Sequence, residues 1–332
     1  MFGIETYEII LLFKQLGIVI AGAAALWGAV FSRRDFSCGT RECIIYDWIA
    51  GKLTLLVFAG VALATLALVF GQTFSVYAHE GIVLVPTLGE IQAALGILFP
   101  LMLVIFCVTL IGFFFYTLNR RRFDAYMTEF LVLEFVLLFI ASSLTSWSGS
   151  LGGEQIFFFV HGFHSIFTLG TVIVLDALFL LSERSRHLKQ HIFPLFPMIS
   201  KVIWIGLAFD FLSSLLVINQ FEVTAKFLFM QTIIGILIIN GVLLSGPITK
   251  KILSFLKEGR ELPQKWSTWA SAAGTISITS WLTITIVDFF EHLTLDYVTL
   301  LLLYLLLITI LFIGHEALER YEKRREAPRA VH

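Results

Sequence analysis

The strongest constraint on the fold is a series of nine long apolar segments. They cover approximately residues 7–31, 47–71, 88–118, 126–148, 155–182, 196–218, 222–247, 267–291 and 296–316. A bilayer core of about 30 Å requires about 20 helical residues to cross it. The segments are continuous and do not alternate polar with apolar residues, which favours helices over barrel strands. We therefore predict an all-α integral membrane protein with nine transmembrane helices.

The composition excludes a water-soluble enzyme. Hydrophobic residues make up 58% of the chain and charged residues 14%, whereas soluble domains carry about 25% charged residues. The net charge of −1 gives no positive field that would attract nucleic acid. The expected partner is the lipid bilayer, and no binding of nucleic acid is expected.

The connecting loops predict the orientation, because basic residues follow only every second apolar segment. They are Arg33, Arg34 and Arg41, then Arg120, Arg121 and Arg122, then Arg184, Arg186 and Lys189, then Lys250, Lys251, Lys257, Arg260 and Lys265, and finally Arg320, Lys323, Arg324, Arg325 and Arg329. Cytoplasmic loops carry the excess of Lys and Arg. This pattern predicts a multi-pass protein of the cell (plasma or inner) membrane, with its N-terminus outside and its C-terminus in the cytoplasm.

The chain also contains a candidate internal repeat. Ala50-Gly51-Lys52-Leu53 and Ile199-Ser200-Lys201-Val202 begin the second and the sixth segment. Two units of the same direction would be parallel repeats, related by an axis along the membrane normal. Chance similarity between apolar stretches is the alternative, since lysine commonly snorkels at a helix end. The predicted organisation is a four-helix unit (1–150), a five-helix unit (151–318) and a basic cytoplasmic tail (319–332).

Two histidines of the fifth segment are candidate cofactor ligands. The i, i+3 spacing of His161 and His164 places both imidazoles on one helix face. They could ligate one metal together, one of them could ligate a haem iron, or both could line a polar seam between helices. A haem with two axial ligands needs a partner at similar depth, for which Met230 and His292 are the candidates.

A second group of candidate ligands lies at the outer end of the eighth segment. Asp288, Glu291 and His292, together with His161 and His164, could bind copper or another divalent metal. A solvated helix cap is the alternative interpretation of these residues.

Acidic residues within the apolar segments are candidates for proton transfer, because ionisable groups at membrane depth are costly and mark function. Asp176 and Asp210 lie in the fifth and sixth segments. Asp176 could instead form a structural ion pair with Lys201. Glu129 and Glu134 of the fourth segment lie on different helix faces, so no paired acid–base site is expected from them.

Three segments of the second half carry a family resemblance: HGFHSIFTLGTVIVLDALFL, SKVIWIGLAFDFLSSLL and FLFMQTIIGILIINGVLLSGP. This region, roughly 155–316, resembles a loose group of polytopic bacterial membrane proteins that includes the CopD-like copper-resistance proteins and the HemJ-type protoporphyrinogen oxidases. The resemblance implies four- or five-helix units and, in some members, b-type haem held by a histidine, here His161 or His164. The first half has Phe13-Lys14-Gln15 where such a histidine would be expected, so the resemblance implies no equivalent cofactor there.

These features together predict a membrane redox or electron-transfer protein with b-type haem in its second helical unit. A haem-dependent membrane oxidoreductase is one form of this hypothesis, and it requires an electron donor or acceptor, or a partner subunit, in the membrane. Two alternatives stay open: a permease or binding protein for copper or another small cation, and a cofactor-free structural subunit of a membrane complex.

Overall fold

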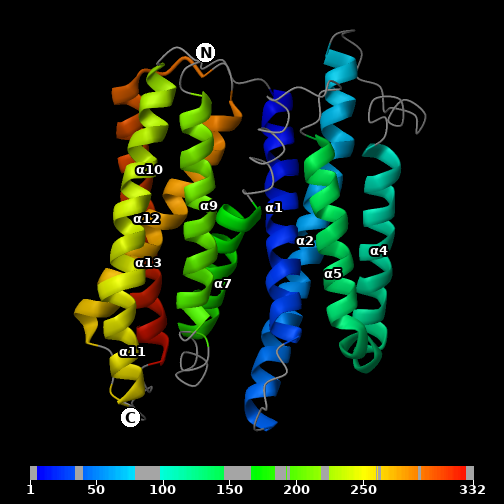
Figure 1. The fold of residues 1–332 in the computed structure, drawn as a ribbon, viewed down its shortest axis with the longest axis horizontal. Helices are drawn as coiled ribbons and strands as arrows, with labels where there is room; N and C mark the ends of the chain where they lie inside the picture. The colour runs from blue at the N-terminus through cyan, green and yellow to red at the C-terminus, as the bar shows by residue number, and fades with distance from the viewer. Residues whose placement is uncertain are drawn as a thin grey trace. The chain divides into compact units, whose positions relative to one another are not determined.

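The computed structural model is helical throughout the part of the chain that it describes. That part comprises residues 6–33, 40–78, 98–145, 166–183, 192, 195–217, 224–258, 260, 263–290 and 293–326. Within these ranges every regular element is a helix and no strand occurs (Figure 1). The predicted all-α class is therefore confirmed.

A helix lies at the place of each predicted span. The elements are α1 (Thr6–Ser32), α2 (Thr40–Ala78), α4 (Leu98–Leu118), α5 (Arg120–Thr145), η1 (Ile166–Gly170), α7 (Thr171–Glu183), α9 (Phe196–Val217), α10 (Ala225–Leu243), η3 (Leu244–Ile248), α11 (Thr249–Lys257), α12 (Gln264–Phe289) and α13 (Tyr297–Glu326). Among the described residues, six helical stretches are long and apolar enough to cross a membrane. The chain is thus a multi-pass membrane protein by the length and hydropathy of its helices.

Two helices extend well beyond their predicted bounds. Helix α2 begins at Thr40 and ends at Ala78, where the apolar segment predicts 47–71. Helix α13 continues to Glu326, so the predicted basic tail 319–332 is helical in its first part. Apolar length marks the part of a helix that lies in lipid, whereas Glu, Lys and Arg are good helix formers that continue it into water.

Large apolar side chains lie exposed along α4 and α13. On α4 they are Leu103, Val104, Phe106, Leu110, Ile111, Phe113, Phe114, Phe115 and Leu118, and on α13 they are Val298, Leu302, Leu303, Leu305, Leu306, Leu307, Ile310, Leu311 and Ile313. Such continuous apolar faces would be a liability in water. They match a bilayer, in which lipid tails cover them.

The described helices form two compact units. One contains α1 to α9 and the other contains α10 to α13. The predicted division at residue 150 lies outside the described residues. In the described part, η1 and α7 belong to the same unit as α1. The four-helix and five-helix organisation stays a prediction.

In the first unit, α1 packs against α2 through glycine. A Cβ atom on Gly60 would lie 2.7 Å from the carbonyl oxygen of Gly17 and 2.8 Å from the amide nitrogen of Ala21. The two backbones are therefore in direct contact. Between helices in lipid there is no hydrophobic driving force, and small residues that permit such close packing supply the van der Waals contact instead.

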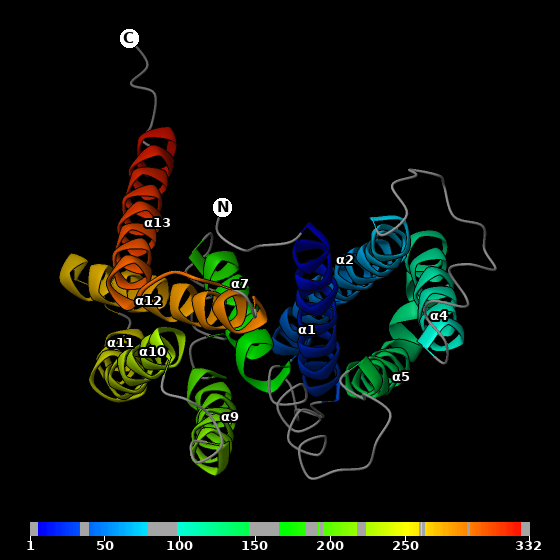
Figure 2. The same ribbon diagram turned by 90° about the horizontal axis from the view of Figure 1, so that it is seen from above.

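The remaining faces of α1 are also lined by small residues. Ile166 of η1 packs on Gly22, Gly170 packs on Ala23, and Leu131 of α5 packs on Gly28. Figure 2 shows α1 between α2 and α5 on one side and α7 on the other. Helix α1 is thus the centre of the first unit.

The second unit combines an apolar cluster with interhelical hydrogen bonds. The cluster consists of Phe229, Ile233, Val287, Leu300 and Tyr304. The bonds run from Asn240 Nδ2 to the Ala273 carbonyl (2.8 Å), from Lys226 Nζ to the Phe290 carbonyl (3.1 Å), and between the hydroxyls of Ser280 and Tyr304 (2.7 Å). They join α10 to α12 and α12 to α13. Lys226 at the start of α10 bonds at the end of α12, and Asn240 near the end of α10 bonds in the first half of α12, so the two helices are antiparallel.

Helix α10 continues through η3 into α11. Pro247 lies inside η3, where it supplies no backbone N–H to the carbonyl one turn earlier. The π-helical turn accommodates this, and the hydroxyl of Thr249 donates to the Leu244 carbonyl at 2.6 Å. The helix therefore passes the proline, and α11 extends beyond the end of the α10 segment.

The α1–α2 contact predicts a position-dependent effect of alanine. Gly60→Ala is expected to destabilise the protein by about 1–3 kcal/mol, because the new methyl group meets backbone atoms that cannot move aside. The measurement is the free energy of unfolding of the purified protein in an SDS titration. Gly235→Ala is the matched control, since a Cβ there meets no atom within 4 Å, and it should be neutral or stabilise by up to about 1 kcal/mol. Equal effects of the two changes would contradict the proposed contact.

Candidate functional site

Several hydroxyl groups in the described helices donate to a carbonyl of their own helix four residues earlier. The pairs are Thr54 with Ala50, Thr109 with Ile105, Thr117 with Phe113, Thr232 with Leu228, Ser245 with Gly241, Ser280 with Ile276, Thr285 with Trp281 and Thr309 with Leu305. Such bonds satisfy a hydroxyl where no water is present. Buried polar atoms that lack this local solution are therefore the informative ones.

The ionisable side chain of Glu134 on α5 is buried, with an exposure of 0%. Its Oε1 lies 2.8 Å from the hydroxyl oxygen of Thr109 on α4. Its Oε2 is buried and has no hydrogen-bond partner among the described residues. An acidic group thus lies at the α4–α5 interface with half of its hydrogen-bonding capacity unused.

The Thr109 hydroxyl lies between two acceptors. Its oxygen is 2.7 Å from the Ile105 carbonyl and 2.8 Å from Glu134 Oε1. A threonine hydroxyl has one hydrogen to donate. It can satisfy either the carbonyl or a carboxylate, and both contacts become hydrogen bonds only if the Glu134 carboxyl itself carries a proton.

Aromatic rings fill the interface between Glu134 and the turn at Asn119. Phe130 lies one turn before Glu134 and packs on Gly112, where it occupies the space of a Cβ. Phe123 packs edge-to-face against both Phe130 and Tyr116, with 5.4 Å between the ring centroids of each pair. These rings separate the carboxyl group from that end of the helix pair.

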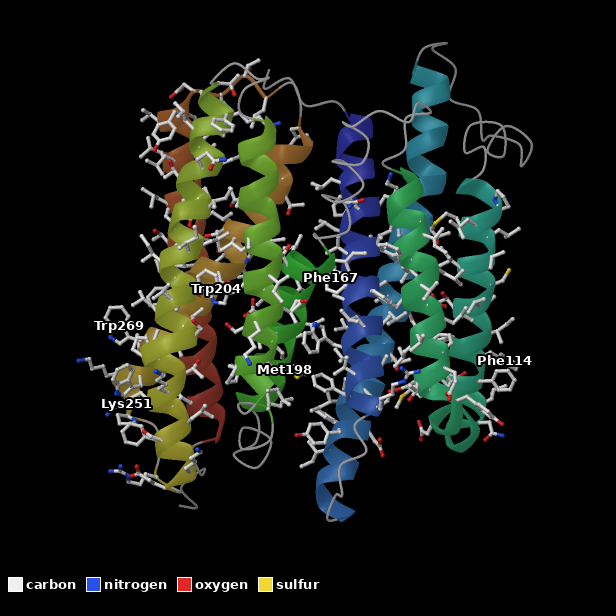
Figure 3. The ribbon with its side chains drawn as sticks, viewed as in Figure 1. Phe114, Phe167, Met198, Trp204, Lys251 and Trp269 are labelled. Atoms are coloured by element: carbon white, nitrogen blue, oxygen red, sulfur yellow. The ribbon has the colours of Figure 1, made fainter. Side chains whose placement is uncertain are left out.

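The opposite face of α4 is exposed. Phe114 is 60% exposed and points away from the helices of its unit (Figure 3). Lipid would cover such a face. Glu134 and Thr109 are buried and face the interior of the unit.

Asp176 of α7 is a second carboxyl group in the same unit. Its Oδ2 is buried and has no hydrogen-bond partner among the described residues. Thr171 begins the same helix, and its hydroxyl accepts a hydrogen bond from Trp27 Nε1 of α1 at 3.1 Å. The other buried polar atoms without a partner in the described part are hydroxyls: those of Thr65, Ser271 and Thr279. A neutral hydroxyl costs far less to bury than a charged carboxylate.

An aromatic contact links the helices that carry the two acids. Phe135, the neighbour of Glu134, packs edge-on against Phe167 of η1 with 6.1 Å between centroids. Helix α7 continues directly from η1. Both acids therefore lie on helices that pack around α1.

Most of the predicted ligand residues lie outside the described part of the chain. This holds for His161, His164, Glu291 and His292, and for the side chains of Asp210 and Asp288, which occupy helical positions of α9 and α12. No group of three metal-ligating residues occurs within the described ranges. The haem and metal sites therefore stay predictions.

Met230 and Lys201 are described. Met230 is partly buried and packs against the apolar cluster around Phe229, the packing role that methionine often has. Lys201 is exposed. No ion pair between Asp176 and Lys201 is present in the described structure.

The sequence did not single out Glu134 as a site residue. The buried face of α5 carries Met127, Leu131, Leu138 and Ala141, and Glu134 continues their three- and four-residue spacing. Glu129, by contrast, is exposed. This periodicity is a usable signal only once the buried face is known, because the exposed face beside Glu134 carries the equally apolar Leu133, Val136 and Ile140.

Comparisons of the chain with protein-family models, with curated proteins and with solved structures gave no match.

The Thr109–Glu134 contact predicts a specific loss of stability. Thr109→Val removes the partner of Glu134 Oε1 and is expected to cost about 1–3 kcal/mol, the price of an unsatisfied buried polar group. The measurement is again the free energy of unfolding in SDS. Thr117→Val on the same helix is the control, because that exposed hydroxyl bonds only to carbonyls of its own helix. A comparable loss for Thr117→Val would show that the contact with Glu134 contributes nothing.

Proposed function

We propose that the chain is a membrane permease that moves a proton or another small cation, with Glu134 as the group that binds and releases it. The single observation that carries this proposal is the fully buried carboxyl group with a vacant oxygen. The sequence analysis assigned its small-cation alternative to His161, His164, Asp288, Glu291 and His292. We assign the binding group to Glu134 instead.

The energetic cost of the residue favours a functional role. The segment 126–148, which contains Glu134, is predicted from the sequence to span the membrane. A carboxylate at membrane depth costs at least about 2.5–3.5 kcal/mol, and such acids mark proton relays and ion pathways. An apolar residue at the position of Glu134 would pack in the same interface without that cost. A purely structural role would also require partners for both oxygens, whereas Oε2 has none among the described residues.

The geometry supports two states that differ by one proton. In the neutral state, the Glu134 carboxyl donates to the hydroxyl oxygen of Thr109, and that hydroxyl donates to the Ile105 carbonyl. When the proton leaves, the Thr109 hydroxyl turns its hydrogen to the carboxylate, and the Ile105 carbonyl keeps only its backbone helix bond. The heavy atoms stay at their observed distances in both states, so the exchange requires little reorganisation.

Asp176 provides a second acid for the same function. The relay role predicted for it from the sequence agrees with its buried Oδ2. The redox hypothesis depends on His161 and His164, which lie outside the described residues, so no described contact carries it.

The proposal predicts an infrared signal from Glu134 that does not depend on the identity of the transported substrate. A protonated carboxyl group gives a C=O band that disappears on ionisation. We expect the pH-difference spectrum of the reconstituted protein to contain such a band, and Glu134→Gln to remove it. In vesicles with an internal pH dye, the same variant should lower the flux of protons across the bilayer at least about tenfold, an effect typical of losing a proton-transfer group.

Glu129→Gln is the matched control, because Glu129 lies on the same helix with an exposed side chain. It should leave both the infrared band and the flux unchanged. A band that persists in Glu134→Gln would overturn the assignment of the proton site to Glu134. Wild-type flux in that variant would overturn the proposed function.

The orientation belongs to the same proposal. The alternation of basic loops places the N-terminus outside and the C-terminus in the cytoplasm of the cell membrane. A green fluorescent protein fused after residue 332 is expected to fluoresce, and a periplasm-dependent phosphatase fused there is expected to stay inactive. The reverse pattern of activities would contradict this orientation.

A further inference from the structure

The end of the second unit at α11 carries a concentration of positive charge. Five basic and two acidic residues lie between positions 249 and 265. Lys250, Lys251 and Lys257 of α11 and Lys265 of α12 are exposed. Arg260 pairs with Glu258 and lies 5.0 Å from the centroid of the Phe255 ring. The four lysines therefore supply the net positive charge of this corner.

The length of the continuous helix places these lysines outside the hydrocarbon core. The stretch Ala225–Phe255 is 31 residues long, more than a bilayer requires. From Lys226 to Ser245 the helix rises about 29 Å at 1.5 Å per residue, close to the ~30 Å thickness of the core. If Lys226 lies at one boundary, α11 lies beyond the other, in the headgroup layer.

The antiparallel contact between α10 and α12 fixes the level of the aromatic residues. Asn240 of α10 bonds to Ala273 of α12. Trp269 lies about one turn before Ala273 in the antiparallel α12, and is therefore level with the start of η3. Trp269 is 53% exposed. Figure 3 shows Trp269 and Lys251 at the same side of the unit, with Trp269 nearer to the middle of the helices. Tryptophan thus marks the boundary, and the lysines follow it outward, as at membrane interfaces.

One face of α11 is apolar. Ile252 is buried, and Leu253 and Phe255 are partly buried, whereas Lys250 and Lys251 precede them on the exposed side. A short helix of this kind presents ammonium groups at headgroup level while its apolar face stays anchored.

We propose that the α11 corner, formed by Lys250, Lys251, Lys257 and Lys265 with Trp269, is a binding site for the headgroup of an anionic phospholipid. The lysines match the phosphate and the negative charge of such a lipid, and Trp269 lies at the level of its glycerol and upper acyl chain. A zwitterionic lipid offers the same chains without net charge and would bind weakly. This site is independent of the proton-binding function proposed for Glu134.

The test is native mass spectrometry of the full-length protein in detergent, titrated with phosphatidylglycerol or with phosphatidylcholine of the same acyl chains. We expect the wild type to retain the anionic lipid preferentially, and added salt to weaken the preference. Each lysine near a charged surface contributes a factor of roughly five in affinity. Lys250→Gln with Lys251→Gln should therefore lower the preference by roughly twentyfold to thirtyfold.

Two control variants separate the site from a general charge effect. Lys250→Arg with Lys251→Arg keeps the charge and should keep the preference. Lys52→Gln with Lys201→Gln removes the same charge from two exposed lysines of the first unit and should leave most of it. An equal loss in both Lys→Gln pairs would overturn the assignment to α11. Equal retention of both lipids by the wild type would overturn the proposal, as would displacement of the lipid by inorganic phosphate at millimolar concentration.

Discussion

The close contact between α1 and α2 is the constraint on which the first unit depends. Lipid tails are as apolar as leucine side chains, so burial of apolar surface does not by itself hold membrane helices together. The contact between the backbones at Gly17 and Gly60 replaces that driving force with dense van der Waals packing. Small residues on the other faces of α1 then admit η1 and α5 at similarly short range, so one helix organises its neighbours.

The candidate proton site follows from this packing. Leu131 rests on Gly28, and the hydroxyls of Thr128 and Ser32 bond at 2.8 Å, which fixes the rotation of α5 against α1. Glu134 lies one turn beyond Leu131 and is thereby turned into the interior of the unit. The same rotation leaves Glu129 exposed. Two acids of one helix thus have opposite environments: Glu134 is buried against Thr109, whereas Glu129 is exposed.

Both units contain side-chain hydrogen bonds between helices, such as Trp27 to Thr171 in the first and Asn240 to Ala273 in the second. The close backbone contact at Gly17 and Gly60 belongs to the first unit. In the second unit a charged segment also continues the helix past the apolar part, because Pro247 is absorbed in a π-helical turn. The result is a helix longer than the hydrocarbon core, with its lysines in the headgroup layer. The proposed cation site and the proposed lipid site therefore arise from separate features of the fold.

Bilayer thickness and hydropathy alone determined the helical class and the places of the helices, because every backbone group in lipid must bond within its own helix. The bounds of α2 and α13 escaped prediction, since charged residues that leave the membrane continue a helix as well as apolar ones do. Tertiary structure alone decided that Glu134 is buried against Thr109 and that Met230 packs against the cluster around Phe229. A helix that is apolar on all sides carries no pattern that separates a face toward lipid from a face toward protein. Only the packing of the neighbouring helices, set by glycines such as Gly60 and Gly28, distinguishes the two.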